Sequence, residues 1–280
     1  MISSVIQGWG DGGHVEALER IAVLMDGHLN KETIARSFLR GKETYDQHAK
    51  VQQKVGRSLI DMLGDYPKMR YDRVLEIGCC TGAMTEMFLA NHTAGTLYLN
   101  DLVPEFYEIV RDRFADQVDT VIEPLFGDIE TLDLPSDLDL VLSSSTFQWL
   151  VDLTEFFIKI ANALKKNGYL AFTLFGPGTL TEFKQLTGVG LTYAALGNVL
   201  DLLEKYFVLE FVETEKHQLF FTSPREVLRH LQATGVGGVG QFRWTGKKLR
   251  DFEEGYIRRF GSAAGVPVTY MTSYVIASRR

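Results

Sequence analysis

The chain has only two cysteines among its 280 residues, and they are adjacent, Cys79 and Cys80. Neighbouring cysteines rarely form a structural disulfide, and two thiols with no histidine nearby make a poor zinc site. The sequence therefore excludes a disulfide framework and gives no reason to expect a bound metal. We interpret the two cysteines as small, half-buried loop residues, with a redox-sensitive pair as the alternative.

Long apolar runs and an excess of positive charge are also missing. No apolar stretch approaches the roughly 20 residues that span a bilayer, and the first ten residues lack the basic-then-apolar order of a secretory signal. Acidic residues outnumber basic ones by 36 to 29, which gives a net charge of −7. Such a charge argues against nucleic acid as the main partner. We therefore expect a cytoplasmic protein that binds neither nucleic acid nor membrane.

What the chain does have is a hydrophobic content of 45% with only seven prolines, as expected of a well-packed globular protein. Between residues 73 and 174, strand-like runs alternate with segments of helical apolar spacing. This alternation predicts an α/β domain with a mostly parallel sheet and helices on both faces. The predicted strands lie at 73–77, 96–100, 120–123, 138–142 and 169–174. The predicted helices lie at 84–90, 104–114 and 153–164, and we expect Lys165–Gly168 to close the last one.

Beyond residue 174 the alternation stops, so we divide the chain into five parts. These are a mobile leader (1–28), a helical cover (29–72), a cofactor-binding core (73–174), a lid or substrate cap with sheet edge (175–265) and a final strand (266–280). Within the cap, Ser223 followed by Pro224 and Glu226 predicts the start of a helix that runs to about Ala233.

The most informative segment is the first predicted strand, which carries Glu76 and stops at Gly78. Gly82 follows four residues later, and Asp101 ends the second strand. Glycine lets a ligand approach the backbone, and a carboxylate at that strand tip can accept hydrogen bonds from ribose hydroxyls. This spacing favours S-adenosylmethionine over a dinucleotide, whose loop would read G-x-G-x-x-G. The alternative is an ordinary strand-to-helix turn.

Two later segments follow predicted strands three and four. In Gly127–Glu130, Asp128 can accept from an adenine amino group while its apolar neighbour Ile129 packs on the ring; the alternative is a simple turn. In the segment 143–149, Phe and Trp side chains can shape an apolar slot, and Gln148 can donate to a carbonyl or carboxylate. The alternative there is a core Trp149 with a capping glutamine.

Upstream, the segment 44–48 is interpreted as a helix that folds over the cofactor with Tyr45 and His48, although His48 alone is more typical of a surface histidine. No nucleophile, base and acid come together in a pattern that would indicate hydrolysis. From Arg225 to Arg259 the chain carries eight basic and four acidic residues, a local reversal of the overall charge. This run is either a solvated helix face or a docking surface for an acidic partner.

Together these motifs resemble the malonyl-[acyl-carrier-protein] O-methyltransferases of biotin synthesis, a family of class I methyltransferases. The resemblance covers about residues 29–280 and rests on K-E-T-I-A-R-S-F, Y-D-Q-H-A-K-V-Q, V-L-E-I-G, G-D-I-E, S-x-x-x-x-Q-W, S-P-R-E-V-L-R-H-L-Q-A-T-G-V and T-Y-x-x-x-Y-V-I-A-S-R. It implies a Rossmann-like fold with a seven-stranded, mostly parallel sheet and an α-helical lid. It also implies that Gly78, Asp101 and Asp128 contact the cofactor. The full set that we predict for the cofactor site adds Tyr45, His48, Glu76, Cys80, Gly82, Leu102, Ile129 and Ser143. One departure is Cys80, which stands where the family usually has a central glycine.

The resemblance implies S-adenosylmethionine as methyl donor, S-adenosylhomocysteine as product and a malonyl thioester on acyl carrier protein, or malonyl-CoA, as acceptor. Gln148 and Trp149 are then expected near the methyl group, and Arg40 and Arg229 are candidates to bind the malonyl carboxylate. The acidic carrier protein would dock on the basic residues 225–259, and we expect a monomer. Two alternatives stay open: a methyltransferase acting on another small acid or a quinone precursor, and a non-catalytic regulatory subunit.

Overall fold

The structure, a computed structural model, describes residues 30–64, 70–117, 119–235 and 244–280. The expected mobile leader at 1–28 lies outside these residues. The chain divides into two units, each described by itself below. Unit 1 takes the described residues of Met1–Gly41 with Leu180–Thr192 and Gln218–Thr269, and unit 2 takes those of Lys42–Thr179 with Tyr193–His217 and Tyr270–Arg280. In the part of the chain described, no helix is both long and apolar enough to cross a membrane.

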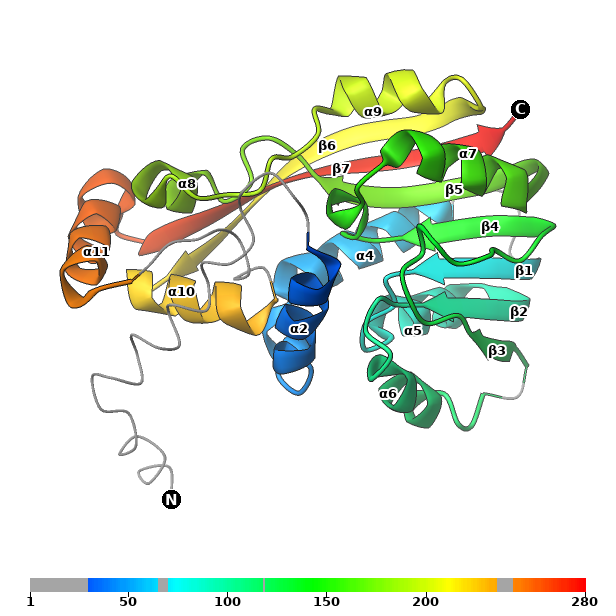
Figure 1. Cartoon of the computed structure of the whole chain (residues 1–280), viewed down its shortest axis with the longest axis horizontal. Helices are drawn as coiled ribbons and strands as arrows, with labels where there is room; N and C mark the ends of the chain where they lie inside the picture. Colours follow the sequence, from blue (N-terminus) through cyan, green and yellow to red (C-terminus); the bar gives the residue numbers. More distant parts are fainter. Residues whose placement is uncertain (1–29, 65–69, 118, 236–243) are drawn as a thin grey trace. The chain divides into compact units, whose positions relative to one another are not determined.

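A seven-stranded sheet in the order β3-β2-β1-β4-β5-β7-β6 organises the fold (Figure 1). Its strands are β1 (Arg70–Ile77), β2 (Thr93–Asn100), β3 (Val121–Pro124), β4 (Leu138–Ser143), β5 (Leu164–Phe175), β6 (Phe207–Phe221) and β7 (Val266–Arg279). The pairs among β1 to β5 are parallel, and β7 runs antiparallel to β5. The predicted seven-stranded, mostly parallel sheet is confirmed, and β6 runs as one continuous strand from Phe207 to Phe221.

Helices cover both faces of this sheet in unit 2, with α4 and α5 on one face and α7 on the other (Figure 1). The helices of this unit are α3 (Tyr45–His48), α4 (Lys50–Leu63), α5 (Ala83–Asn91), α6 (Phe106–Arg113), α7 (Leu153–Ala163) and α9 (Leu196–Leu203). Apolar residues recur every four positions along α4, where Val51, Val55 and Leu59 are all buried. Asp152 begins α7 by accepting hydrogen bonds from the backbone N–H groups of residues 154 and 155.

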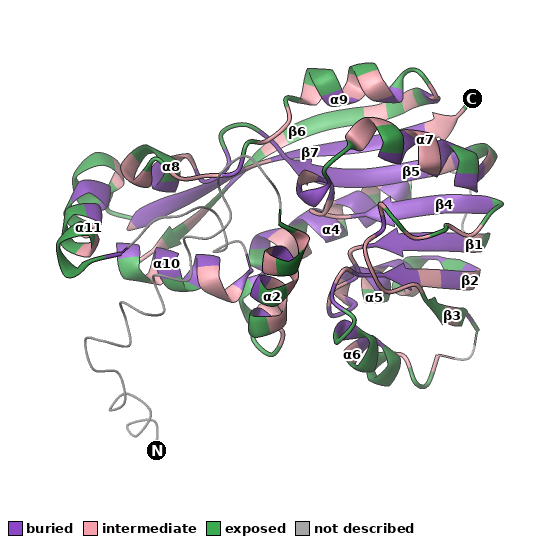
Figure 2. Ribbon diagram, viewed as in Figure 1, coloured by how far each residue is buried: buried purple, intermediate pink, exposed green. Residues whose placement is uncertain are grey.

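The core lies along the central strands, which Figure 2 shows buried, whereas the edge strand β3 is largely exposed. All six residues of β4 are buried, as expected for a parallel strand covered on both faces. Next to it, the rings of Phe147 and Phe172 stack with centroids 4.7 Å apart. This packing fixes the carboxyl ends of β1 and β4, where the predicted site residues lie.

The prediction that Lys165–Gly168 closes a helix is wrong. Helix α7 ends at Ala163, and β5 begins at the next residue. Lys165 Nζ lies 3.1 Å from Oδ1 of the buried Asp139 in the neighbouring strand β4, and this ion pair holds the segment in the sheet. Asn167 takes a φ of +60°, so the segment 165–168, which was predicted to end a helix, forms an irregular start of β5 instead.

Unit 1 contains helices α2 (Lys31–Gly41), α8 (Thr181–Thr187), α10 (Pro224–Ala233) and α11 (Gly246–Phe260). The predicted start and end of α10 are confirmed, because Ser223 caps it by accepting from the N–H of Glu226 and the helix ends at Ala233. Helix α11 packs on α8 through Phe252 and Phe183, whose ring centroids are 5.8 Å apart. The expected lid role of the region 175–265 stays a prediction.

Candidate active site

The loop after β1 approaches its neighbours so closely that two glycines are required. Gly78 has a φ of +77°, and a Cβ placed there would lie 2.1 Å from Thr146 Oγ1. Gly82 has a φ of +84°, and its Cβ would lie 2.8 Å from a ring carbon of Phe114. Both positions therefore demand glycine for conformation and for space. The loop is fixed by tertiary contacts as well as by its own turn.

Cys80 occupies the middle of this loop with a φ of +50°, in the left-handed region that favours glycine. The backbone thus keeps the conformation of the expected central glycine despite the side chain. Burial, and next the nearby Asp101, raise the pKa of the Cys80 thiol well above its usual value, and Cys79 is affected in the same way. Both thiols are therefore protonated at neutral pH, which argues against the redox-sensitive alternative.

Asp101, directly after β2, faces this loop. Its Oδ2 accepts from the Cys80 N–H at 2.8 Å, and its Oδ1 accepts from the Val103 N–H at 2.9 Å. Each carboxylate oxygen can accept a further hydrogen bond, so a ribose diol could still bind. Burial raises the pKa of Asp101 to about 6. The structure brings Asp101 and Cys80 together as predicted, and their contact with a cofactor stays a prediction.

Glu76, the penultimate residue of β1, is buried with one carboxylate oxygen satisfied and one not. Thr85 Oγ1 donates to Glu76 Oε2 at 2.7 Å, whereas Oε1 has no hydrogen-bond partner among the described residues. Burial raises the pKa of Glu76 to about 7, although the Thr85 hydrogen bond lowers it in part. A buried carboxylate with one unsatisfied oxygen needs a cationic or hydrogen-bond donor group, and the described residues do not supply one.

The loop after β4 carries a second left-handed residue, Ser145, with a φ of +54°. Its N–H donates to Thr173, and Gln148 Nε2 donates to the Ser145 carbonyl at 2.6 Å. Ser145 Oγ and Gln148 Oε1 are buried without a partner among the described residues. The hydroxyl of Ser143 donates to the Ile77 carbonyl, and Trp149 is buried. Gln148 was expected to donate to a ligand, but in this arrangement its open group is an acceptor.

These open oxygens fit the methionine end of S-adenosylmethionine. Residues Glu76 and Leu142 are register partners at the ends of β1 and β4, so both loops leave the same edge of the sheet. An ammonium group has three N–H donors and no acceptor. Glu76 Oε1, Ser145 Oγ and Gln148 Oε1 are each without a partner among the described residues, and each can accept a hydrogen bond from such a group. The residues present therefore fit the predicted cofactor.

The predicted adenine side is formed by the loops after β2 and β3. Asn100 joins them, since its Nδ2 donates to the carbonyls of Leu125 (2.7 Å) and Gly127 (3.1 Å). Asp128 Oδ1 accepts from the Glu130 N–H, so this aspartate also stabilises its own turn. Ile129 is buried, whereas Leu102 is half-buried. The turn and the cofactor interpretation of Asp128 are thus compatible.

Glu130 and Lys159 were not singled out from the sequence, yet they join the loops after β3 and β4. Glu130 accepts hydrogen bonds from the N–H groups of Val151 and Asp152, at 2.9 to 3.1 Å. Lys159 Nζ donates to the carbonyls of Ile129 (2.9 Å) and Glu130 (3.2 Å). Because these contacts join residues more than 20 positions apart in the chain, no local sequence pattern predicts them. The motif G-D-I-E contains Glu130 but does not indicate this role.

Comparison with known proteins agrees with this geometry. Residues 75–172 match a family model described as a methyltransferase domain. The malonyl-[acyl-carrier protein] O-methyltransferase of Prosthecochloris aestuarii is 39% identical over 88% of this chain and 92% of its own length. That of Bacteroides helcogenes is 35% identical over 90% of this chain and its own full length. The chain belongs to the malonyl-[acyl-carrier protein] O-methyltransferase family.

A solved structure with a similar fold agrees with the architecture of this member of the O-methyltransferase family. An S-adenosylmethionine-dependent methyltransferase from Mesorhizobium loti superposes with a TM-score of 0.50 at 18% identity, covering 79% of this chain and 96% of that one. The predicted Rossmann-like methyltransferase fold is confirmed, and so is S-adenosylmethionine as the cofactor.

The remaining predicted residues lie on short helices and at helix ends. Tyr45 and His48 are the first and last residues of α3; Tyr45 is half-buried and His48 is exposed. Burial, and next the nearby Cys80 and Asp101, raise the pKa of Tyr45 well above its usual value. The structure therefore brings Tyr45 to the cofactor loop of this methyltransferase. His48 matches the surface histidine that was the simpler expectation.

Arg40 and Arg229, the predicted carboxylate clamp, both belong to unit 1 and are exposed. Arg40 lies in the last turn of α2, where its guanidinium donates to Ser37 Oγ at 3.1 Å. Arg229 lies in α10, on the face opposite to the buried Val227 and Leu228. Their role in the methyltransferase stays a prediction.

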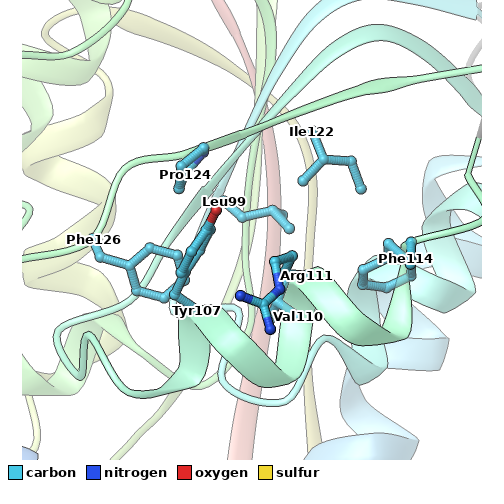
Figure 3. Close-up of a pocket in the computed structure, with 9 residues that line it drawn as sticks. Leu99, Tyr107, Val110, Arg111, Phe114, Ile122, Pro124 and Phe126 are labelled. Atoms are coloured by element: carbon cyan, nitrogen blue, oxygen red, sulfur yellow. The ribbon is translucent and has the colours of Figure 1, made fainter.

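A cavity of about 200 Å³ lies between α6 and the strands β2 and β3 (Figure 3). Tyr107 and Arg111 of α6 face Phe126 and Pro124 across it, and the rings of Tyr107 and Phe126 are 5.7 Å apart. None of the predicted cofactor residues lines this cavity. It is therefore separate from the predicted set of cofactor-binding residues.

Proposed function

We propose that this protein transfers the methyl group of S-adenosylmethionine to the free carboxylate of a malonyl thioester carried by acyl carrier protein. The observation that supports the acceptor is the near full-length identity of 39% to a malonyl-[acyl-carrier protein] O-methyltransferase. The observation that supports the donor is the set of open acceptors on Glu76, Ser145 and Gln148. In the resembled family this ester is an early intermediate of biotin synthesis.

The proposed reaction requires no acid–base catalysis by the protein. When bound, the sulfonium cofactor supplies an electrophilic methyl group. A malonyl carboxylate is ionised at neutral pH, so one of its oxygens forms the new O–CH₃ bond while the sulfur keeps the electron pair of the broken S–CH₃ bond. No proton moves, and no general base is needed.

What this chain must provide is orientation and partial desolvation. Trp149, buried beside Gln148, supplies an apolar neighbour to the half-buried loop after β4, whereas Phe147 belongs to the core. We propose Arg40 and Arg229 as the residues that bind the malonyl carboxylate, since a guanidinium is the side chain best suited to hold a carboxylate. The regulatory-subunit alternative rested on Cys80, and it loses its basis because Cys80 keeps the backbone conformation of glycine.

The direct test is incubation with methyl-labelled S-adenosylmethionine and malonyl-acyl carrier protein. We expect a base-labile labelled methyl ester. Intact cofactor binding without transfer to either the carrier-bound or the coenzyme A thioester would refute the proposal. Transfer to a quinone precursor or to an unrelated small acid instead would identify the other methyltransferase alternative.

We also propose that acyl carrier protein docks on α11. Its exposed basic residues are Lys247, Lys248, Arg250, Arg258 and Arg259. Arg225 of α10 is paired with Glu253, so this arginine is engaged within unit 1. Beside the charges, Ile257 is 57% exposed and offers an apolar contact. An acidic carrier protein complements such a surface in charge.

Charge reversal tests this surface. The variant K247E/K248E should raise KM for malonyl-acyl carrier protein about tenfold and leave KM for malonyl-CoA within twofold, because only the carrier has a protein surface to dock. The matched control K205E/K216E makes the same charge change at two exposed lysines of unit 2. Equal effects of the two double variants would place docking elsewhere. The cytoplasmic location and the monomeric state are retained as proposals.

A further inference from the structure

A network of charged side chains connects three segments around the loop after β1. It has no role in the methyl transfer described above. Arg113, the last residue of α6, donates through Nη1 to Asp46 Oδ2 at 3.2 Å and to the Thr81 carbonyl at 3.0 Å. Its Nη2 contacts Glu86 Oε2 of α5. One guanidinium thus joins α3, the loop after β1 and α5.

Asp46 is bound to that loop a second time, because Thr81 Oγ1 donates to Asp46 Oδ1 at 2.6 Å. The short distance is typical of a hydrogen bond to a charged acceptor. Asp46 Oδ1 therefore binds the loop that contains Gly82 directly, and Oδ2 binds Arg113, which itself binds that loop. The Arg113 side chain is 27% exposed and that of Asp46 is 45% exposed, so the ion pair is partly shielded from water.

Helix α3 is also held to α4, because Gln53 Nε2 donates to the Asp46 carbonyl at 2.7 Å. It is four residues long, none of its residues is fully buried, and its N-cap residue Thr44 makes no capping hydrogen bond with its side chain. A helix this short is not stable by itself. Its first residue, Tyr45, is the side chain that lies near Cys80 and Asp101. The bonds of the Asp46 side chain therefore contribute to holding Tyr45 next to the loop.

We propose that Arg113 is a positioning residue that latches α3 over the bound cofactor, through Asp46 and Thr81. The latch sets how long the cofactor and its product stay bound. Breaking it frees Tyr45 to leave the loop and increases the dissociation rate of S-adenosylhomocysteine. The inference rests on the proposed cofactor site and is independent of the proposed acceptor.

The test compares R113M with R111M. Both arginines lie on α6 and both are ion-paired, but the partner of Arg111 is its exposed neighbour Asp112. We expect R113M to raise the Kd for S-adenosylhomocysteine about tenfold in calorimetry, chiefly through a faster dissociation rate in a chase experiment. R111M should stay within twofold of the unchanged protein.

Further variants separate positioning from general destabilisation. D46N keeps an acceptor for Thr81 and loses the charge, so it should reproduce part of the R113M effect, and D46N/R113M should be no worse than R113M alone. R113K should recover part of the affinity. Equal Kd values for R113M and R111M, or additive effects of D46N and R113M, would overturn the latch. Because binding of the product is measured, a failure of malonyl methylation would leave this result unchanged.

Discussion

The loops after β1 and β4 leave neighbouring strands, and each contains one non-glycine residue in the left-handed region, yet they differ in how their polar groups are used. In the first, the Cys80 N–H is bound by Asp101. In the second, Ser145 Oγ and Gln148 Oε1 stay buried and open. In the loop after β1 the protein itself satisfies this hydrogen-bonding group. In the loop after β4 the two open oxygens gain a partner only when a ligand binds. Strain at Ser145 together with open acceptors is the combination expected where chemistry takes place.

The largest expected effect comes from a substitution that creates a steric clash between the loops after β1 and β4. G78A would place a methyl group 2.1 Å from Thr146 Oγ1 at a left-handed residue. We expect a loss of about 2–4 kcal/mol in unfolding free energy and no measurable cofactor binding. Urea denaturation and calorimetry would measure the two effects.

The control for G78A is G188A, where φ is +72° and nothing lies within 4 Å of the added Cβ. It carries the conformational cost alone, about 1–2 kcal/mol. T146A should recover part of the loss in G78A. A G78A variant no less stable than G188A would show that the two loops are not in close contact.

A second effect concerns Glu76 and pH. Its pKa rises from 4.5 to about 7 on folding, so its favourable contribution is full below pH 4.5 and is lost as the pH rises through 7. The difference corresponds to about 3 kcal/mol. Without cofactor, E76Q should therefore be more stable than the unchanged protein at pH 8 by up to about this amount, and less dependent on pH between 4.5 and 7.5.

Thermal or urea unfolding across that pH range would measure the effect, with E123Q at an exposed glutamate of β3 as the control. E76Q should at the same time weaken cofactor binding, because the amide cannot pair with an ammonium group as a carboxylate does. A stability profile for E76Q parallel to that of E123Q would contradict the assignment of the buried charge.

The smallest effect compares the two strained residues directly. C80G and S145G each remove a left-handed side chain, which relieves about 1–2 kcal/mol, offset by about 0.4–1 kcal/mol from the greater freedom of glycine in the unfolded chain. Each should gain roughly 0.5 kcal/mol in stability. C80G should leave kcat unchanged, whereas S145G should lower it several-fold, since it also removes an open hydroxyl. Equal kcat values would remove the distinction between the loops.

Local patterns predicted the strands, the glycine loop with Asp101 and the capped start at Ser223, because each depends on neighbours in the sequence. They failed at Lys165, whose partner Asp139 lies in another strand. They also missed Glu130 and Arg113, which bind backbone or side chains more than 20 residues away. Arg40 and Arg229 stay predictions, and they rest on the resemblance alone.

Asn100 has a further consequence for the order of binding events. By holding the carbonyls of Leu125 and Gly127, it fixes the loops at the predicted nucleoside end of the site before any ligand binds. Backbone amides there, such as the Gly127 N–H that donates to the Asp101 carbonyl, should exchange slowly with deuterium even in the free protein. If the prediction holds, we expect the nucleoside to bind there with a small cost in ordering entropy. It can dock first and leave the methyl-bearing end to be ordered last.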